Sequence, residues 1–132
     1  MTGERETILV IADDSANLEL ARVLLELEGY QVRTASDAVS AFEVLKECQP
    51  ALIVMDIQLP GVDGWELTQR LKTNFATRQI PVIALTAYTM PGDEVRARAV
   101  GCDDYIAKPI STEELPEIVK RNLKGNPFSR RR

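Results

Sequence analysis

Four short apolar segments constrain the fold of this chain more than any other feature of its sequence. Each is followed by polar residues, and they are Ile8–Ile11, Leu52–Met55, Val82–Leu85 and the weaker Tyr105–Ala107. Segments this short, β-branched and without polar alternation are typical of strands that helices cover on both faces. Because the less apolar segment Gln31–Ala35 suits an edge strand, we predict five strands.

Segments with the apolar spacing of amphipathic helices separate these strands. Gly29 closes the first as a left-handed cap, and Ser111 with Glu114 forms a capping box for the last. Pro116 would then fall in the second turn, so we expect the last helix to begin at Pro116 or to bend there. The predicted helices are Ser15–Glu28, Ser36–Cys48, Gly64–Asn74, Pro91–Val100 and a final helix that ends at Leu123.

The fivefold alternation of strand and helix predicts an α/β fold with a doubly wound, five-stranded parallel sheet and right-handed crossovers. A chain of 132 residues is long enough for one core. We place the domain at residues 7–124, with a disordered N-terminus at 1–6 and a flexible basic tail at 125–132. Ligands of such folds bind beyond the carboxyl ends of the strands.

Polar side chains with a shared chemistry follow four of the five predicted strands. If the strand order is the flavodoxin-like 2-1-3-4-5, the first and third strands are neighbours and all these groups meet at one edge. They are Asp13 and Asp14 after the first strand, Asp56 after the third, Thr86 after the fourth and Lys108-Pro109 after the fifth.

This cluster predicts phosphoryl chemistry. Carboxylates about 4 Å apart repel each other by roughly 1 to 4 kcal/mol, so an acidic cluster needs a cation, and Mg²⁺ prefers such hard oxygen ligands. With its charge neutralised, Asp56 can attack phosphorus and form an acyl phosphate, while Thr86 and Lys108 bind the phosphoryl oxygens.

Each of these residues also has an ordinary structural interpretation. Asp13 or Asp14 could cap the first helix, and Asp56 could be a loop carboxylate. Thr86 could be a strand-end hydroxyl, and Lys108 a solvated surface charge. The convergence of all of them on one edge of the sheet favours the chemical interpretation.

Composition excludes several other functions. The absence of histidine removes Ser-His-Asp hydrolysis, histidine-ligated zinc and a role as phosphohistidine donor. A net charge of −4 argues against direct nucleic-acid binding. No apolar run approaches the roughly 20 residues that span a bilayer, so we expect a cytoplasmic protein without membrane insertion. Cys48 and Cys102 form no CxxC motif, and we expect them to be small buried core residues.

Four motifs resemble those of the response-regulator receiver family. They are ILVIADD at 8–14, MDIQLPGVDG at 55–64, PVIALTA at 81–87 and GCDDYIAKPIS at 101–111. The resemblance covers Thr7 to Lys124 and is strongest to stand-alone regulators of the DivK type, which are CheY-like, and to the receivers of hybrid sensor kinases.

The resemblance implies a role for each matching residue. Asp56 would be the phosphoacceptor, Thr86 the hydroxyl switch, Lys108 the essential lysine and Tyr105 the aromatic switch. The remaining roles would fall to the backbone carbonyl of Gln58 as a metal ligand, a cis bond between Lys108 and Pro109, and Ala87 as the small residue beside the phosphate.

The resemblance also implies a cofactor and partners. The cofactor would be Mg²⁺ or Mn²⁺, and the phosphoryl donor a histidine kinase or a phosphotransfer protein. A downstream protein target would bind the face formed by the fourth helix, the fifth strand and the fifth helix.

One position departs from the family. An ungapped register keeps Asn17 and Gly29 in step with the family's first helix, and it places Ala12 where the first of two acidic residues is expected. Asp13 is then the direct metal ligand. Ala12 either lowers the affinity for the metal, or Asp14 compensates for the missing carboxylate.

We therefore predict a single-domain response regulator of a two-component phosphorelay, a signalling domain that assists its own Mg²⁺-dependent phosphorylation and dephosphorylation rather than an enzyme. Alternatives are a phosphorelay shuttle, the receiver of a hybrid kinase system, and a pseudo-receiver that binds its partner constitutively.

A haloacid-dehalogenase-type phosphatase is disfavoured because Gln58 stands where it would need a second aspartate. A flavodoxin is disfavoured because no Ser/Thr/Gly-rich loop follows the first predicted strand.

Overall fold

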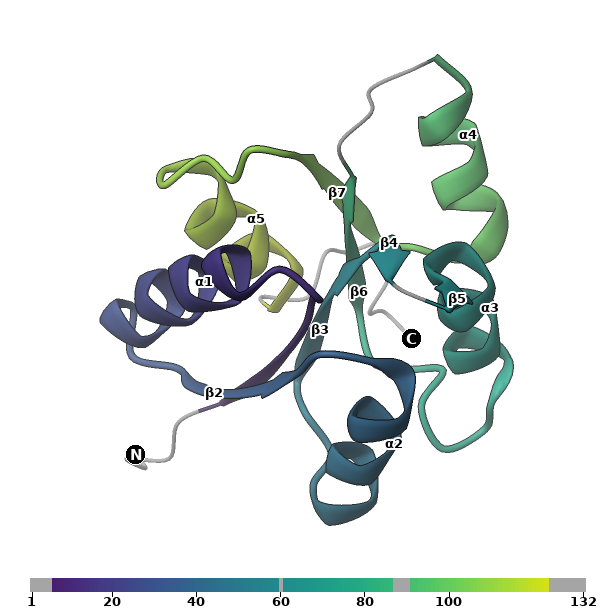
Figure 1. Cartoon of the computed structure of the whole chain (residues 1–132), viewed down its shortest axis with the longest axis horizontal. Helices are drawn as coiled ribbons and strands as arrows, with labels where there is room; N and C mark the ends of the chain where they lie inside the picture. Colours follow the sequence, from purple (N-terminus) through teal and green to yellow (C-terminus); the bar gives the residue numbers. More distant parts are fainter. Residues whose placement is uncertain (1–5, 60, 87–90, 124–132) are drawn as a thin grey trace.

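The computed structural model describes residues 6–59, 61–86 and 91–123 and contains the predicted parallel sheet (Figure 1). The sheet order β2-β1-β3-β6-β7 is 2-1-3-4-5 when its strands are counted along the chain, which confirms the predicted flavodoxin-like order. The strands are β1 (Thr7–Ile11), β2 (Gln31–Ala35), β3 (Leu52–Asp56), β6 (Val82–Thr86) and β7 (Asp104–Ala107).

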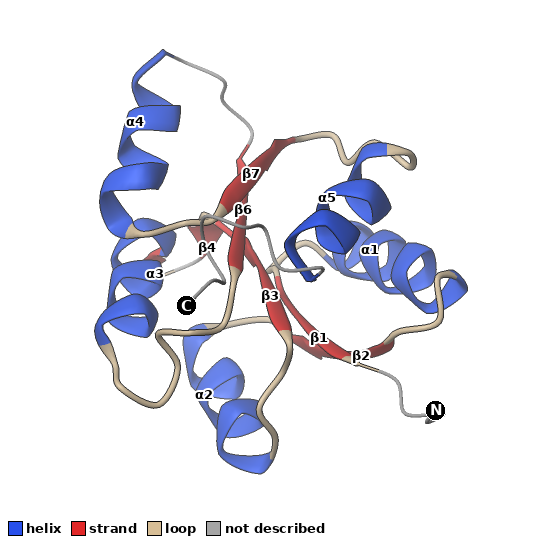
Figure 2. Cartoon of the chain, turned by 180° about the vertical axis from the view of Figure 1, so that it is seen from behind, coloured by secondary structure: helices blue, strands red, loops and turns tan. Residues whose placement is uncertain are grey.

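In the part of the chain that the structure describes, five helices cover the two faces of this sheet (Figures 1 and 2). The helices α1 (Ser15–Leu27) and α5 (Glu114–Leu123) lie on one face. The helices α2 (Ala38–Glu47), α3 (Gly64–Thr73) and α4 (Pro91–Val100) lie on the other. Both faces of the central strands are therefore buried, which explains why their sequences are continuously apolar.

Each central strand contributes alternate residues to two separate cores. In β1, Ile8 and Val10 pack toward α1 and α5, whereas Leu9 and Ile11 pack toward α2, α3 and α4. All four side chains are fully buried. This two-residue alternation decides which side chains share a face where the strands end.

The observed first residues of two helices differ from the prediction. The helix α2 begins at Ala38 rather than Ser36, because the Asp37 carboxylate accepts a hydrogen bond from the Ser40 amide (2.8 Å) and caps the helix. The helix α5 begins at Glu114, so Pro116 lies in its first turn and not in the second. The expected start at Pro116 was wrong, and so was the reason for a bend, because amides of a first turn have no intrahelical partner to lose. The Ser111 hydroxyl does accept from the Glu114 amide (3.1 Å), but it does so across the turn that precedes the helix.

A short antiparallel hairpin that the sequence did not predict follows β3. It consists of β4 (Gln58–Leu59) and β5 (Val62–Asp63), with Gly61 at a positive φ of 72° between them. The Gly64 amide closes it by donating to the Ile57 carbonyl (3.0 Å). The backbones approach so closely that a Cβ on Gly64 would lie 2.4 Å from the Ile57 oxygen, so only glycine fits there.

A mostly buried ion pair between Lys72 and Asp103 connects α3 to the amino ends of β6 and β7. The Lys72 ammonium donates to the Asp103 carboxylate (3.1 Å) and to the Ile80 carbonyl (2.9 Å), and the same carboxylate accepts from the Val82 amide (2.9 Å). The Lys72 and Asp103 side chains are only 15% and 16% exposed. Three elements are thus held together at the end of the sheet opposite Asp56.

Both cysteines are free and only partly buried, and they pack against the core on the α2, α3 and α4 face rather than inside it, so the expectation that they are buried core residues was wrong. Burial nevertheless raises the pKa of the Cys102 thiol to about 12.

Among the described residues, no helix has the length and apolar character needed to span a bilayer. Residues 1–5 of the expected disordered N-terminus, and the expected basic tail, lie outside the described residues.

Replacing Lys72 by methionine should lower the free energy of unfolding by about 1–3 kcal/mol, because it leaves the Asp103 carboxylate mostly buried without its cation. Urea denaturation followed by circular dichroism measures this change. The matched control is Arg70→Met on the same helix, whose ion pair with Glu66 is 3.6 Å long and exposed. Equal losses in the two variants would contradict a clamp at Lys72.

Replacing Gly64 by alanine should lower the free energy of unfolding by about 1–3 kcal/mol, because the added Cβ overlaps the backbone of Ile57. In contrast, Gly92→Ala should cause no loss, since no atom outside its own helix lies within 4 Å of a Cβ there. Thermal unfolding of both variants tests the pair. A wild-type transition for Gly64→Ala would show that the hairpin relaxes freely.

Candidate functional site

The Asp56 carboxylate is the centre of the candidate site, at the carboxyl end of β3. Asp56 is 1% exposed, and its Oδ1 accepts a hydrogen bond from the Gln58 amide (2.9 Å). The Lys108 ammonium lies 2.9 Å from each carboxylate oxygen and donates to Oδ2. A buried charge requires such partners, so the ion pair and the amide together allow an ionised carboxylate in the interior.

Lys108 follows β7 and is held in place by its own backbone. Its amide donates to the Thr86 carbonyl (2.7 Å), which ties it to the end of β6, and its peptide bond with Pro109 is cis, the geometry that the resemblance implies. The Lys108 side chain is 16% exposed, whereas that of Asp56 is 2% exposed, so the lysine is the outer member of the ion pair.

The two expected switch residues lie on neighbouring strands. Thr86 ends β6, is 3% exposed and pairs in register with Ala107, the residue before Lys108. Tyr105 pairs with Ala84, and its ring is partly buried against the core on the α2, α3 and α4 face. Ala87, expected beside the phosphate, lies outside the described residues.

The residues after β1 take three different places. Ala12 is fully buried, and its amide donates to the Ala35 carbonyl of β2 (3.0 Å). Asp13 is exposed at the carboxyl edge. Asp14 is the N-cap of α1, because its Oδ1 accepts from the amides of Ala16 (2.8 Å) and Asn17 (3.4 Å).

The donor atoms at this edge suit a hard divalent cation. The carboxylates of Asp13 and Asp56 and the carbonyl of Gln58 are oxygen ligands, which Mg²⁺ prefers, and water completes the shell that this ion usually retains. No group of three or more histidine, cysteine, aspartate or glutamate side chains suited to a metal occurs within the described ranges. The fit to Mg²⁺ therefore rests on the oxygen chemistry of these donors.

One carboxylate near the site was not recognised in the sequence. Asp63 caps α3 by accepting from the Trp65 amide (2.9 Å), and it binds the Arg96 guanidinium of α4 (3.3 Å). That guanidinium also lies 5.3 Å from the centre of the Trp65 ring. The Asp-Gly pair at the start of a predicted helix was the available signal for the cap, whereas nothing in the sequence pointed to Arg96.

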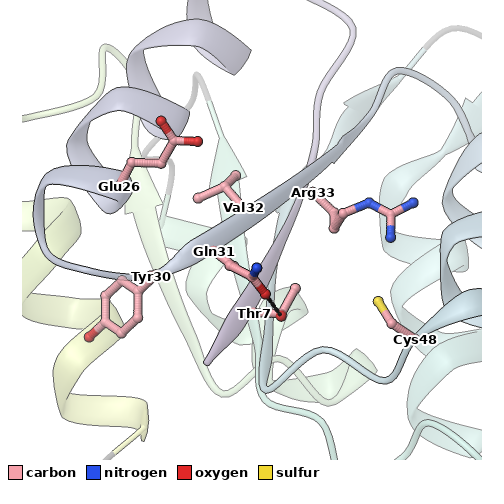
Figure 3. Close-up of a pocket in the computed structure, with 7 residues that line it drawn as sticks. All are labelled: Thr7, Glu26, Tyr30, Gln31, Val32, Arg33 and Cys48. Carbon is pink, nitrogen blue, oxygen red and sulfur yellow. Dashed lines mark hydrogen bonds between the residues drawn. The ribbon is translucent and has the colours of Figure 1, made fainter. Parts of the chain in front are cut away.

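A separate pocket of about 620 Å³ lies at the opposite end of the strands (Figure 3). Its lining includes Thr7 at the start of β1 and residues 31–33 of the edge strand β2. The Thr7 hydroxyl donates a hydrogen bond to the side chain of Gln31 (3.3 Å). None of the strand-end residues described above lines it. The candidate site is therefore the open edge around Asp56 and not this pocket.

Comparisons with known proteins agree with this geometry. The response regulator receiver domain family matches residues 8–120. The polar-differentiation response regulator DivK of Brucella anthropi is 42% identical over 118 residues, which are 89% of this chain and 96% of that protein.

Two solved structures extend the comparison. The signal receiver domain of a signal transduction histidine kinase from Syntrophus aciditrophicus has a TM-score of 0.82 at 36% identity, and the match covers 90% of each chain. The receiver domain of the sensor histidine kinase PA1611 from Pseudomonas aeruginosa has a TM-score of 0.82 at 30% identity, covering 92% of this chain and all of that one. Its crystal structure has a magnesium ion coordinated in the active site cleft. The chain therefore belongs to the response regulator receiver domain family, whose members act in two-component signalling.

Proposed function

We propose that this protein accepts a phosphoryl group on Asp56 and then changes its contacts with a protein partner. The observation that carries the proposal is the buried Asp56 carboxylate paired with the Lys108 ammonium at the carboxyl edge of the sheet. Such a carboxylate is fixed in direction and lies beside a cation that can also bind the oxygens of a phosphoryl group. These properties are what a phosphoryl acceptor requires.

The transfer itself is a displacement at phosphorus. A carboxylate oxygen of Asp56 forms a bond to phosphorus while the bond between phosphorus and a donor imidazole nitrogen breaks, and the electron pair stays on that nitrogen. During the transfer the Lys108 ammonium moves its contact from Asp56 to a phosphoryl oxygen. The Thr86 hydroxyl donates to another of these oxygens. Catalysis is then mainly positioning and charge neutralisation.

A divalent ion, Mg²⁺ or Mn²⁺, would be held by Asp13, Asp56 and the carbonyl of Gln58. When bound, it would neutralise the charge that develops on the phosphoryl oxygens. Asp56 keeps its orientation through the Gln58 amide, which places the carboxylate and the carbonyl of the same short segment at one edge.

The phosphoryl group would be read out through Thr86 and Tyr105. Thr86 ends β6, and Tyr105 lies within the neighbouring strand β7, opposite Ala84. A displacement of Thr86 toward the phosphoryl group would leave space for the ring of Tyr105. The change would favour one of two surface conformations on the face formed by α4, β7 and α5, where a downstream protein binds.

The donor would be the phosphohistidine of a histidine kinase or a phosphotransfer protein in the cytoplasm. The output would be protein contact, as in a single-domain response regulator. A phosphorelay shuttle or a receiver of a hybrid kinase system would use the same chemistry and return the group to a histidine. A constitutive pseudo-receiver is the second candidate, and Ala12 is the observation that favours it.

Incubation with acetyl phosphate and Mg²⁺ should add one phosphoryl group to the wild-type protein, and Asp56→Asn should reduce the labelling to background. Mass spectrometry of the intact protein measures both. Asp37→Asn is the matched control, because Asp37 is an exposed helix cap and asparagine caps equally well. The absence of labelling in wild type, with the fold intact by circular dichroism, would replace the switch by the constitutive binder.

A further inference from the structure

The neighbour of Asp56 on the adjacent strand is an alanine, and the structure shows how closely the two positions are related. The register pairs Val10 with Val54 and Ile11 with Met55, so Ala12 and Asp56 lie level at the carboxyl edge. Val10 and Val54 both face the core of α1 and α5, and residues two positions further share that face. Ala12 therefore occupies the place from which a side chain would reach the surroundings of the phosphoacceptor.

The backbone of Ala12 cannot easily yield this place to its successor. Ala12 is fully buried, and its amide is bound to the Ala35 carbonyl of β2 (3.0 Å). A shift by one residue would break this bond and turn every side chain of β1 to the opposite core. The alanine is therefore a fixed feature of the edge.

The nearest carboxylate that could compensate is already engaged elsewhere. Asp14 Oδ1 accepts from the Ala16 and Asn17 amides, and Oδ2 accepts from the side-chain nitrogen of Asn17 (3.4 Å). Turning the carboxylate toward Asp56 would leave the first turn of α1 without its cap. The two roles compete for the same oxygens.

We infer that Ala12 sets a weak affinity for the divalent ion at this site and that Asp14 acts as a helix cap and not as a metal ligand. The inference rests on the proposed function, because it concerns the same site. Two aspartates and Lys108 give the metal-free edge one net negative charge, where a third carboxylate would give two. Because the occupancy of the metal would then vary with its concentration, phosphorylation of Asp56 would depend on the supply of Mg²⁺.

The charge difference fixes the expected size of the effect. A carboxylate about 5 Å from a divalent ion, at a dielectric constant near that of water, changes the affinity by roughly tenfold. Placing a carboxylate at position 12 should therefore strengthen Mg²⁺ binding by about this factor, even though the two neighbouring carboxylates repel each other.

Isothermal titration calorimetry with magnesium chloride tests the roles inferred for Ala12 and Asp14, and it needs no phosphoryl donor. Asp14→Asn keeps a capping oxygen but loses the charge, and it should change the Kd for Mg²⁺ by less than about twofold. Asp14→Ala should leave the Kd equally unchanged but lower the midpoint of thermal unfolding, because the cap is lost. Asp13→Asn is the positive control and should weaken binding at least tenfold.

The gain-of-affinity arm compares Ala12→Asp with Ala12→Asn, which has a similar shape and no charge. Only the aspartate should bind Mg²⁺ about tenfold more tightly than wild type. If the buried position prevents Ala12→Asp from folding, as circular dichroism would show, the two Asp14 variants decide the question. Weaker Mg²⁺ binding by Asp14→Asn, comparable to that of Asp13→Asn, would overturn the inference. Equal affinities of folded Ala12→Asp and Ala12→Asn would also overturn it.

The proposed function fails by a different result. If acetyl phosphate does not label the wild-type protein while the order of Mg²⁺ affinities holds, the site is a metal site without phosphoryl transfer. If labelling depends on Asp56 while Asp14→Asn loses the metal, the proposed function stands and Asp14 is a ligand.

Discussion

The contact between the Lys108 ammonium and the Asp56 carboxylate is the interaction on which the candidate site depends. A carboxylate that is 1% exposed can keep its charge only with such compensation, and the compensation comes from a residue 52 positions away in sequence. The parallel sheet, in which β3, β6 and β7 lie side by side, brings the two together. The continuous apolar strands are therefore a precondition of the chemistry, because their burial fixes the register that aligns their carboxyl ends.

Much of this arrangement could be predicted from sequence because each step has a strong local signal. Short β-branched runs indicated the buried strands, and the alternation with helices indicated a parallel sheet and a shared edge. All five strands followed from these signals, and Asp56 and Lys108 meet as the flavodoxin-like order that we assumed for them requires. The family resemblance assigned roles to residues that topology alone could only place near one another.

The features that were missed depend on contacts that local sequence does not encode. The β4 and β5 hairpin is two residues long on each side and is closed by the approach of Gly64 to Ile57, which no periodicity reveals. Pro116 was placed one turn too late because the capping box was taken to start the helix, whereas the residues before Glu114 form a turn. The two interpretations of Asp14 were equally consistent with sequence, and only the geometry of α1 shows its carboxylate on the helix amides.

Asp63 has a mechanical consequence, since its two carboxylate oxygens serve different elements. One oxygen fixes the start of α3, directly after the hairpin that carries Gln58, and the other holds the guanidinium of Arg96 on α4. A displacement of α4 must stretch or break this exposed contact, which is of the modest strength usual for surface pairs. The hairpin of β4 and β5 and the helix α4 are thus coupled through the single side chain of Asp63. Because the contact with Arg96 is exposed and weak, it can break and form again without disturbing the rest of the fold.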